Sequence, residues 1–178
     1  GYNSMSSNLT GQYNTSLGAW ALTTNTTGNC NVAIGFRASS STTKACGTIS
    51  IGACALYSNT SGSCNTAIGY VALAGSSISS NNVAIGAFTL CRSTNGINTA
   101  IGSESMRYNT TGFSNTSLGY SSLRTNMTGN YNTAVGHASL YITNGGVRNS
   151  AFGMNTLSAN TTGSCNTAVG MYAGCSLT

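Results

Sequence analysis

Short apolar and polar segments recur at a fixed interval along the whole chain. Segments of the type Asn-Thr-Ala-Ile-Gly close on a glycine, and successive closing glycines are 17 residues apart, with one interval of 16 between Gly86 and Gly102. These glycines are Gly18, Gly35, Gly52, Gly69, Gly86, Gly102, Gly119, Gly136, Gly153 and Gly170. Self-similarity at a fixed period indicates a solenoid, in which each repeat packs only on its neighbours.

Two apolar columns run through the repeats. A leucine or methionine follows four residues after most closing glycines, as at Leu22, Leu56 and Leu73, with Ser39 as an exception. The residue before each closing glycine is also apolar: Leu17, Ile34, Ile51, Ile68, Ile85, Ile101, Leu118, Val135, Phe152 and Val169. Alternating Thr, Val and Ile between glycines favour strands and tight turns over helices. We therefore predict an all-β fold, a parallel β-solenoid (β-roll or β-helix) with one coil per repeat, whose like residues form ladders about 4.8 Å apart.

The strand residues are expected to divide between two faces, because side chains two positions apart share a face. We interpret the Leu17-to-Val169 column as each chain's own core. The neighbouring small residues then face another chain, because an unbroken column of small side chains suits a close-packed axis. Its alanines are Ala33, Ala67, Ala84, Ala100, Ala134 and Ala168. Burying each large side chain yields only about 1.5–3 kcal/mol, against roughly 1–2 kcal/mol of backbone entropy per residue. Either backbone ladders and stacked asparagines supply the rest, or chains associate and bury a second face. Because the small column lies beside so thin a core, we predict a homotrimer with this column near its axis.

The repeat spans the chain from end to end. Residues 1–178 are therefore expected to be one array of about ten 17-residue repeats. Gly1 falls at the position of a closing glycine, and about half a repeat follows Gly170, so we expect a segment of a longer fibre. The 16-residue repeat and the turn after Ser39 should be local defects that leave the ladder in register, because surface turns absorb length changes.

The composition argues against several classes of function. Charged residues make up 4% of the chain and hydrophobic residues 40%, which is unlike a disordered protein. The basic residues are scattered, whereas nucleic-acid binding requires clusters that neutralise phosphates. No apolar run approaches the ~20 residues of a membrane span. We expect no nucleic-acid partner and no membrane insertion in this segment.

Catalytic chemistry lacks its usual residues. Glu104 is the only acidic residue and His137 the only histidine, which excludes paired-carboxylate catalysis and a Ser-His-Asp triad. We therefore predict no enzyme and no cofactor. The seven cysteines contain no CxxC pair that would indicate a metal site. Cys30, Cys46 and Cys64 lie at nearly the same offset in successive repeats, which would suit either a disulfide column or free, half-buried thiols.

Two further sets of residues are candidates for modification or binding. Asn-X-Ser/Thr sequons serve either as turn residues, whose amides bond the backbone, or as glycosylation sites. They include Asn8, Asn25, Asn59, Asn109, Asn126 and Asn160. Arg107 and Arg124 lie five residues after the closing glycines of adjacent repeats. They would stack as a short basic ladder, which either aids solubility or forms a weak, multivalent site for anionic glycans.

The segments NTAIGYVAL at 65–73 and NTSLGYSSLRTNMTGNYNTAVG at 115–136 resemble repeats in the heads of trimeric autotransporter adhesins and in fibre proteins of phages and large viruses. The resemblance covers the entire chain and implies homotrimeric parallel β-rolls or β-helices that project adhesive or receptor-binding tips. The best-known adhesin heads use a shorter coil.

These observations lead to a functional expectation. We expect the shaft of an extracellular, cell-surface or virion-surface fibre, with an adhesive or spacer role, that associates with itself and with host-surface or matrix glycans. A self-assembling filament or surface-layer subunit is the alternative. An ice-binding solenoid is less favoured, because its threonine column is interrupted by apolar residues, in the order Thr15, Val32, Ile49, Thr66, Val83 and Thr99.

Overall fold

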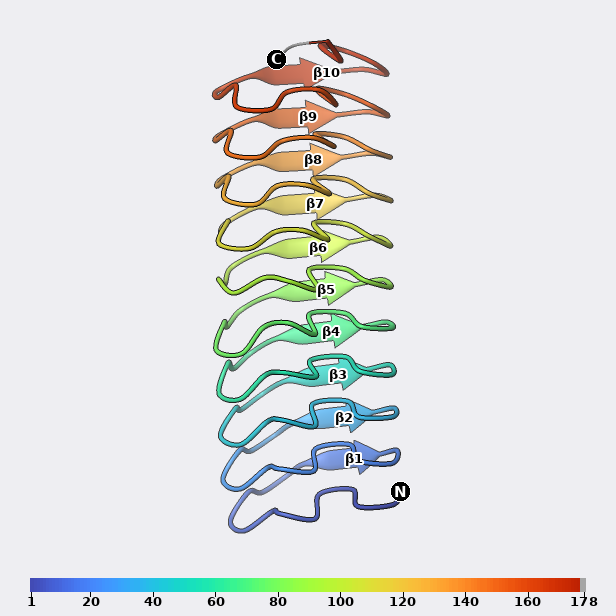
Figure 1. The fold of residues 1–178 in the computed structure, drawn as a ribbon, viewed down its shortest axis with the longest axis vertical. Coiled ribbons are helices and arrows are strands. Elements are labelled where there is room, and N and C mark those ends of the chain that lie inside the picture. Colours follow the sequence, from blue (N-terminus) through green and yellow to red (C-terminus); the bar gives the residue numbers. More distant parts are fainter. Residues whose placement is uncertain (177–178) are drawn as a thin grey trace.

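The chain folds into a β-solenoid. The structure, a computed structural model, describes residues 1–176, and Figure 1 shows ten parallel strands stacked in sequence order into one sheet, with no helix in the described part of the chain. The strands are β1 Thr15–Leu17, β2 Val32–Ile34, β3 Ile49–Ile51, β4 Thr66–Ile68, β5 Val83–Ile85, β6 Thr99–Ile101, β7 Thr116–Leu118, β8 Thr133–Val135, β9 Ser150–Phe152 and β10 Thr167–Val169. This confirms the predicted parallel solenoid with one coil per repeat.

The register of the sheet follows the repeat. Ile34 pairs with Ile51, and Ile51 pairs with Ile68. The ladder also continues through the short repeat, where Thr99 pairs with Val83 on one side and with Thr116 on the other. The prediction that the missing residue leaves the strands in register is therefore confirmed.

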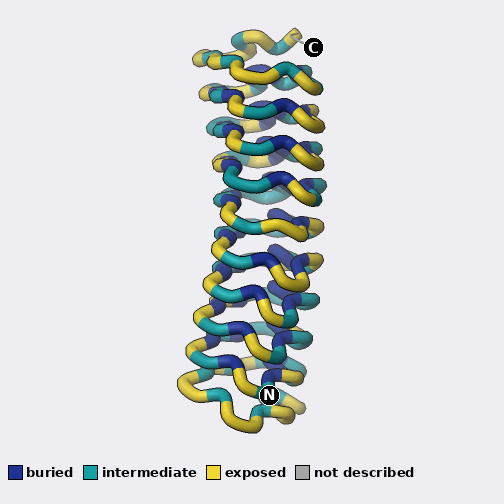
Figure 2. Tube along the Cα trace, turned by 90° about the vertical axis from the view of Figure 1, so that its left-hand side faces the viewer, coloured by how far each residue is buried: buried dark blue, intermediate teal, exposed yellow. Residues whose placement is uncertain are grey.

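The two faces of the sheet are the reverse of those predicted. The central residue of each strand points into the coil, and Ala33, Ala84 and Ala100 are completely buried within a single chain. The predicted core residues point outward instead: Leu17 is 63% exposed and Phe152 is 40% exposed. Figure 2 shows that the buried positions recur at the same places in successive coils. The coil is so narrow that only a small strand side chain fits inside it.

Opposite the strand, the interior of most coils is filled mainly by one large apolar side chain. We call its large residues the leucine column, and each of them is fully buried: Leu22, Leu56, Leu73, Leu90, Met106, Leu123, Leu140 and Leu157. The small strand residues pack against this column; we call them the alanine column, with the members Ala33, Ala67, Ala84, Ala100, Ala134, Ala151 and Ala168. Ser39 interrupts the leucine column, and its hydroxyl donates to Ser50 Oγ across the coil (2.9 Å). The hydrophobic core is divided into two clusters at this coil.

A buried asparagine precedes most strands and links adjacent coils. Asn65 donates from Nδ2 to the Ser79 carbonyl (2.7 Å), and its Oδ1 accepts the backbone N–H of Asn82 (3.0 Å). The ladder continues past the short repeat, because Asn98 donates its N–H to Asn82 Oδ1 and accepts that of Asn115, both at 3.1 Å. Buried polar groups cost little free energy once they are hydrogen-bonded. This ladder therefore fills the half of the interior that no large apolar residue occupies.

Adjacent coils are also hydrogen-bonded outside the strands, in the turn where every second residue has a positive φ. Phe88 and Leu90, two and four residues after Gly86, have positive φ values of 57° and 49°. The Phe88 N–H points back to the Tyr70 carbonyl (2.9 Å), and the Leu90 N–H points forward to the Ser105 carbonyl (3.1 Å). Each coil is therefore hydrogen-bonded to both neighbours along its turns as well as its strand.

The closing glycine is required by the stacking itself. Gly69 has a φ of +132°, and a Cβ added there would lie 2.6 Å from the carbonyl carbon and oxygen of Gly86 in the next coil. Since backbone atoms cannot move aside without breaking the ladder, only glycine fits this column.

A second asparagine column, at the opposite corner of the coil, is interrupted by threonines and serines. In this column Asn126 Nδ2 donates to Asn109 Oδ1 in the preceding coil (3.1 Å) and to the Gly129 carbonyl in its own (2.9 Å). Where Thr143 replaces the next asparagine, the buried Oδ1 of Asn126 has no hydrogen-bond partner among the described residues. The column also needs a glycine three residues later, because a Cβ at Gly129 would lie 2.3 Å from Asn126 Oδ1.

Completing this column should stabilise the protein where the glycine is already present. We expect Thr143→Asn, which is followed by Gly146, to satisfy Asn126 and to raise the free energy of unfolding by about 1 kcal/mol, in spite of the lost bond from Thr143 Oγ1 to the Asn160 carbonyl. Thr42→Asn should instead destabilise, since Ala45 stands at the glycine position. Urea denaturation followed by circular dichroism measures both changes; equal effects of the two substitutions would contradict the steric argument.

Candidate functional site

The outward side of the β-sheet is the most extensive candidate surface. We call it the outer sheet face, formed by the first and third residues of each strand. Its third residues are the apolar column Leu17, Ile34, Ile51, Ile68, Ile85, Ile101, Leu118, Val135, Phe152 and Val169. Its first residues mix Thr15, Thr66 and other threonines with Val32, Val83 and Ile49. The face therefore runs the length of the stack as a partly exposed apolar stripe beside a mixed stripe.

Charge is confined to the rest of the coil. No strand contains a charged residue. Arg37 lies in the turn after β2, beside the Trp20 ring at 5.5 Å, and the other charged residues likewise lie in turns: Lys44, Arg92, Glu104, Arg107, Arg124 and Arg148. A large surface that combines apolar side chains with an absence of charge is unusual for a monomer in water.

Arg107 and Arg124 do not form a free basic ladder. Arg107 donates to Glu104 Oε1 at 2.8 Å, and Arg124 donates through Nε to Glu104 Oε2 at 2.7 Å. The hydrogen bond from Arg124, followed by the charges of both arginines, holds the pKa of Glu104 below its ordinary value. The carboxylate therefore stays ionised at neutral pH and offsets one of the two positive charges.

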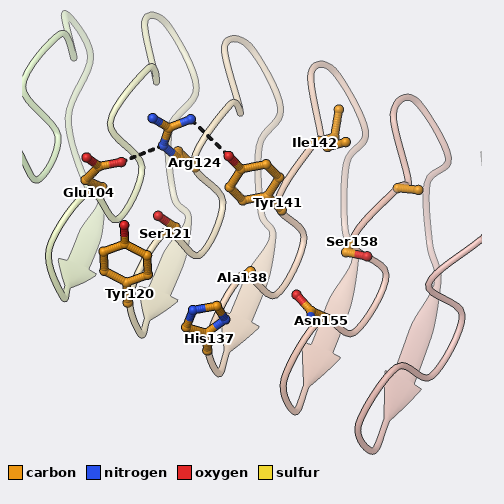
Figure 3. Close-up of a pocket in the computed structure, with 11 residues that line it drawn as sticks. Glu104, Tyr120, Ser121, Arg124, His137, Ala138, Tyr141, Ile142, Asn155 and Ser158 are labelled. Atoms are coloured by element: carbon orange, nitrogen blue, oxygen red, sulfur yellow. Dashed lines mark hydrogen bonds and ion pairs between the residues drawn. The ribbon is translucent and has the colours of Figure 1, made fainter.

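Arg124 also forms one wall of a groove that the sequence did not reveal. The groove has a volume of about 550 Å³ and crosses several adjacent coils on the turn that follows the strands. Figure 3 shows its two walls, with Ser121 and Ala138 between them. We call it the aromatic groove, lined by Glu104, Tyr120, Ser121, Arg124, His137, Ala138, Tyr141, Ile142, Asn155, Ser158 and Ala159. A signal existed in the sequence: two of the smallest residues of one column, Ser121 and Ala138, lie in successive repeats.

Of the two alternatives for the cysteine column, the structure shows free thiols and no disulfide among the described cysteines. Cys30, Cys46 and Cys64 are free thiols, as are the other four cysteines, Cys54, Cys91, Cys165 and Cys175. Cys30 and Cys64 share a column but lie two coils apart with Gly47 between them, a separation of about 9.6 Å at the usual strand spacing, which is beyond disulfide reach. Cys46 is one residue out of register, and its sulfur accepts the Asn29 N–H (3.4 Å).

The sequons are structural residues. Asn25, Asn59, Asn109 and Asn126 are completely buried, and Asn160 is 1% exposed. Asn59 Nδ2, the atom that would carry a glycan, donates to the Gly62 carbonyl at 2.9 Å. A glycan at these positions is incompatible with the folded coil, so the glycosylation hypothesis is wrong for them. Asn8 is half-buried, and its Nδ2 donates to the Gly11 carbonyl at 2.9 Å.

His137 and Cys91 are two further residues whose side chains could take part in chemistry. His137 stacks on Tyr120 with 5.4 Å between ring centroids. Burial raises the pKa of the Cys91 thiol, which makes this thiol less nucleophilic at neutral pH. Within residues 1–176, no three His, Cys, Asp or Glu side chains gather as metal ligands. The same residues include no helix that could cross a membrane.

Comparison of the chain with protein-family models, curated proteins and solved structures finds no match.

Proposed function

We propose that the chain is the self-associating shaft of an extracellular or virion-surface fibre, with an adhesive or spacer role. The observation that carries this proposal is the outer sheet face. It is apolar and uncharged over the length of the stack, while the interior of the single chain has room for only one large apolar residue per coil. A monomer would therefore leave its most apolar surface in water.

A second copy of the same chain is the best partner for this face. Removing apolar surface from water contributes about 25 cal/mol per Å², so a stripe along ten strands is a strong driving force. Each coil presents its side chain at the same spacing as the coil above it. A chain with the same repeat can match this periodic ladder throughout its length, whereas an unrelated surface would match it over a few coils only.

We propose three copies around a common axis. Each chain has one outer sheet face, so a closed cyclic arrangement can bury all copies of this face at the centre and leave the charged turns outside. The resemblance to trimeric fibre repeats favours three chains over two. The association surface is then the apolar column that contains Ile68 and Ile85, and not the alanine column.

The assembly is tested by mass in solution. Light scattering should give three times the 18.0 kDa mass of one chain. Ile68→Lys combined with Ile85→Lys should give monomers with an unchanged circular-dichroism spectrum, because each buried ammonium would be unpaired at the axis. Ile78→Lys is the matched control: Ile78 is 67% exposed and lies outside the outer sheet face, so its variant should stay trimeric. A monomeric mass for the unmodified chain would reject the proposal.

The same measurement distinguishes a closed trimer from the alternative, an open filament, whose mass would grow with protein concentration.

Ice binding has less support. The threonine column of the outer sheet face is interrupted by Val32, Ile49 and Val83, and the adjoining column contains Leu, Ile, Val and Phe. A regular pair of threonine columns, which would order water, is missing from this face.

A further inference from the structure

The aromatic groove exists because two adjacent coils lack a large side chain at one position. Two residues after the closing glycine, other coils carry the large residues Trp20, Arg37, Phe88 and Glu104 or the smaller Cys54, Val71 and Asn155, whereas Ser121 and Ala138 stand here in succession. All these residues share the positive φ of that column, so the backbone does not change. The groove thus lies where two successive coils carry the small residues Ser121 and Ala138 in this column.

One wall of the groove is aromatic. The Tyr120 and His137 rings stack with an interplanar angle of 24°, and together they extend over two successive coils (Figure 3). Tyr120 is 51% exposed, so its ring is available to a ligand. On the opposite wall, Tyr141 lies next to Arg124, with the guanidinium carbon 5.7 Å from the Tyr141 ring centroid.

Planar hydrogen-bonding groups surround these rings. Arg124 is fixed from both sides, because Nε donates to Glu104 Oε2 at 2.7 Å and Nη1 donates to the Tyr141 hydroxyl at 3.0 Å. The other terminal nitrogen of this guanidinium, Nη2, donates no hydrogen bond within residues 1–176. The Asn155 side chain lies at the far end of the groove (Figure 3). The groove therefore offers a fixed donor, a carboxylate acceptor, an amide that does both, and several hydroxyls.

We propose that the aromatic groove binds a short neutral oligosaccharide lying along the axis of the stack. A pyranose ring has an apolar C–H face that packs on aromatic rings such as Tyr120, and an edge of hydroxyls that each donate and accept. The remaining guanidinium nitrogen of Arg124 and the Asn155 amide can donate to sugar hydroxyls, and the Asn155 amide oxygen and the remaining lone pairs of the Glu104 carboxylate can accept from them. The coil spacing of about 4.8 Å is close to the length of one sugar unit in an extended chain, so successive coils can contact successive sugars.

The charge of the groove favours a neutral sugar over an acidic one. Glu104 faces the groove with its pKa lowered, and its carboxylate neutralises the guanidinium of Arg124 at 2.7 Å. Arg107 is bound to the other carboxylate oxygen and does not line the groove. An anionic ligand would therefore meet a guanidinium whose charge Glu104 already neutralises. This replaces the expectation of an anionic-glycan ladder formed by Arg107 and Arg124.

Filling the groove with side chains that the same column already contains tests the site. The probes are defined neutral di- and trisaccharides of glucose, galactose and N-acetylglucosamine, with sialyllactose and heparin oligosaccharides as acidic counterparts. Saturation-transfer NMR on the unmodified chain should detect at least one neutral probe. Ser121→Phe with Ala138→Phe should weaken this binding at least tenfold. Val71→Phe, in the same column but outside the groove, should leave it unchanged.

Two further measurements keep the test decisive. If the phenylalanine variant does not fold, Tyr120→Ala and Asn155→Ala, which truncate groove side chains, should each weaken binding severalfold while leaving the circular-dichroism spectrum unchanged. Binding of acidic probes alone, with loss of binding at 0.5 M salt, about the concentration at which charges are strongly screened, would overturn the neutral-sugar proposal, as would the absence of binding to every neutral probe. The mass of each sample is measured in parallel, so a monomeric chain that binds sugar separates this inference from the proposed assembly.

Discussion

Replacing Ala84 and Ala100 together by leucine is expected to destroy the central coils of the solenoid, in a monomer as much as in an assembly. Both methyl groups are completely buried inside one chain and lie in the same cluster as the leucine column. A well-packed core loses about 1–3 kcal/mol for each added group of this size. The loss here should be at the upper end, because a coil cannot widen without breaking the backbone ladder to both of its neighbours.

The measurement is urea denaturation of the double variant followed by circular dichroism. Ala87→Leu is the control, because Ala87 lies one residue after a closing glycine, where other coils carry Phe36, Tyr70 or Tyr120. It should unfold at the same urea concentration as the unmodified chain. A double variant that kept its stability but lost its assembly would instead place Ala84 and Ala100 between chains.

The repeat predicted the fold and the register because both depend on spacing alone. Stacking of Ile34, Ile51 and Ile68 follows from the 17-residue period, whatever the shape of the coil. The spacing does not determine which side of each strand points into the coil. Alternating small and large residues are compatible with either orientation, and the choice depends on the width of the coil, which only the tertiary structure defines. The rule that large apolar residues fill the core holds where the interior is wide. This coil is too narrow for a large strand residue, so the small residues face inward.

Other features were hidden because one residue type serves two roles. The sequence motif of Asn59 and Asn109 is that of an exposed glycan acceptor, yet their amides are buried turn residues. Likewise, Phe88 and Leu90 adopt positive φ, although nothing in their side chains indicates it; cross-coil hydrogen bonds impose that conformation. The aromatic groove depends on four adjacent coils at once, so a search for local motifs does not find it.

The coil that contains Ser39 offers the largest expected gain in stability. Ser39 and Ser50 replace a leucine and an alanine at facing positions and bond to each other at 2.9 Å, and the apolar core is split at this coil. Ser39→Leu with Ser50→Ala should join the two clusters. A buried leucine contributes about 1.5–3 kcal/mol. Against this, the two hydrogen bonds that are lost, between the serines and from Ser50 to the Val32 carbonyl, cost about 1 kcal/mol each at most, because both serine hydroxyls are removed together.

The single variants should differ from the double variant in a defined way. Ser50→Ala alone leaves the Ser39 hydroxyl buried without this partner, which should cost about 1–3 kcal/mol. Ser39→Leu alone is tolerated better, because the Ser50 hydroxyl also donates to the Val32 carbonyl at 3.1 Å. The leucine itself should fit, since Ser39 and Leu56 have nearly equal φ values of 48° and 52°. A double-mutant cycle from urea denaturation should therefore give a favourable coupling between the two substitutions. If the double variant were less stable than the unmodified chain, the serine pair would be an integral part of the interior and not a gap in its apolar core.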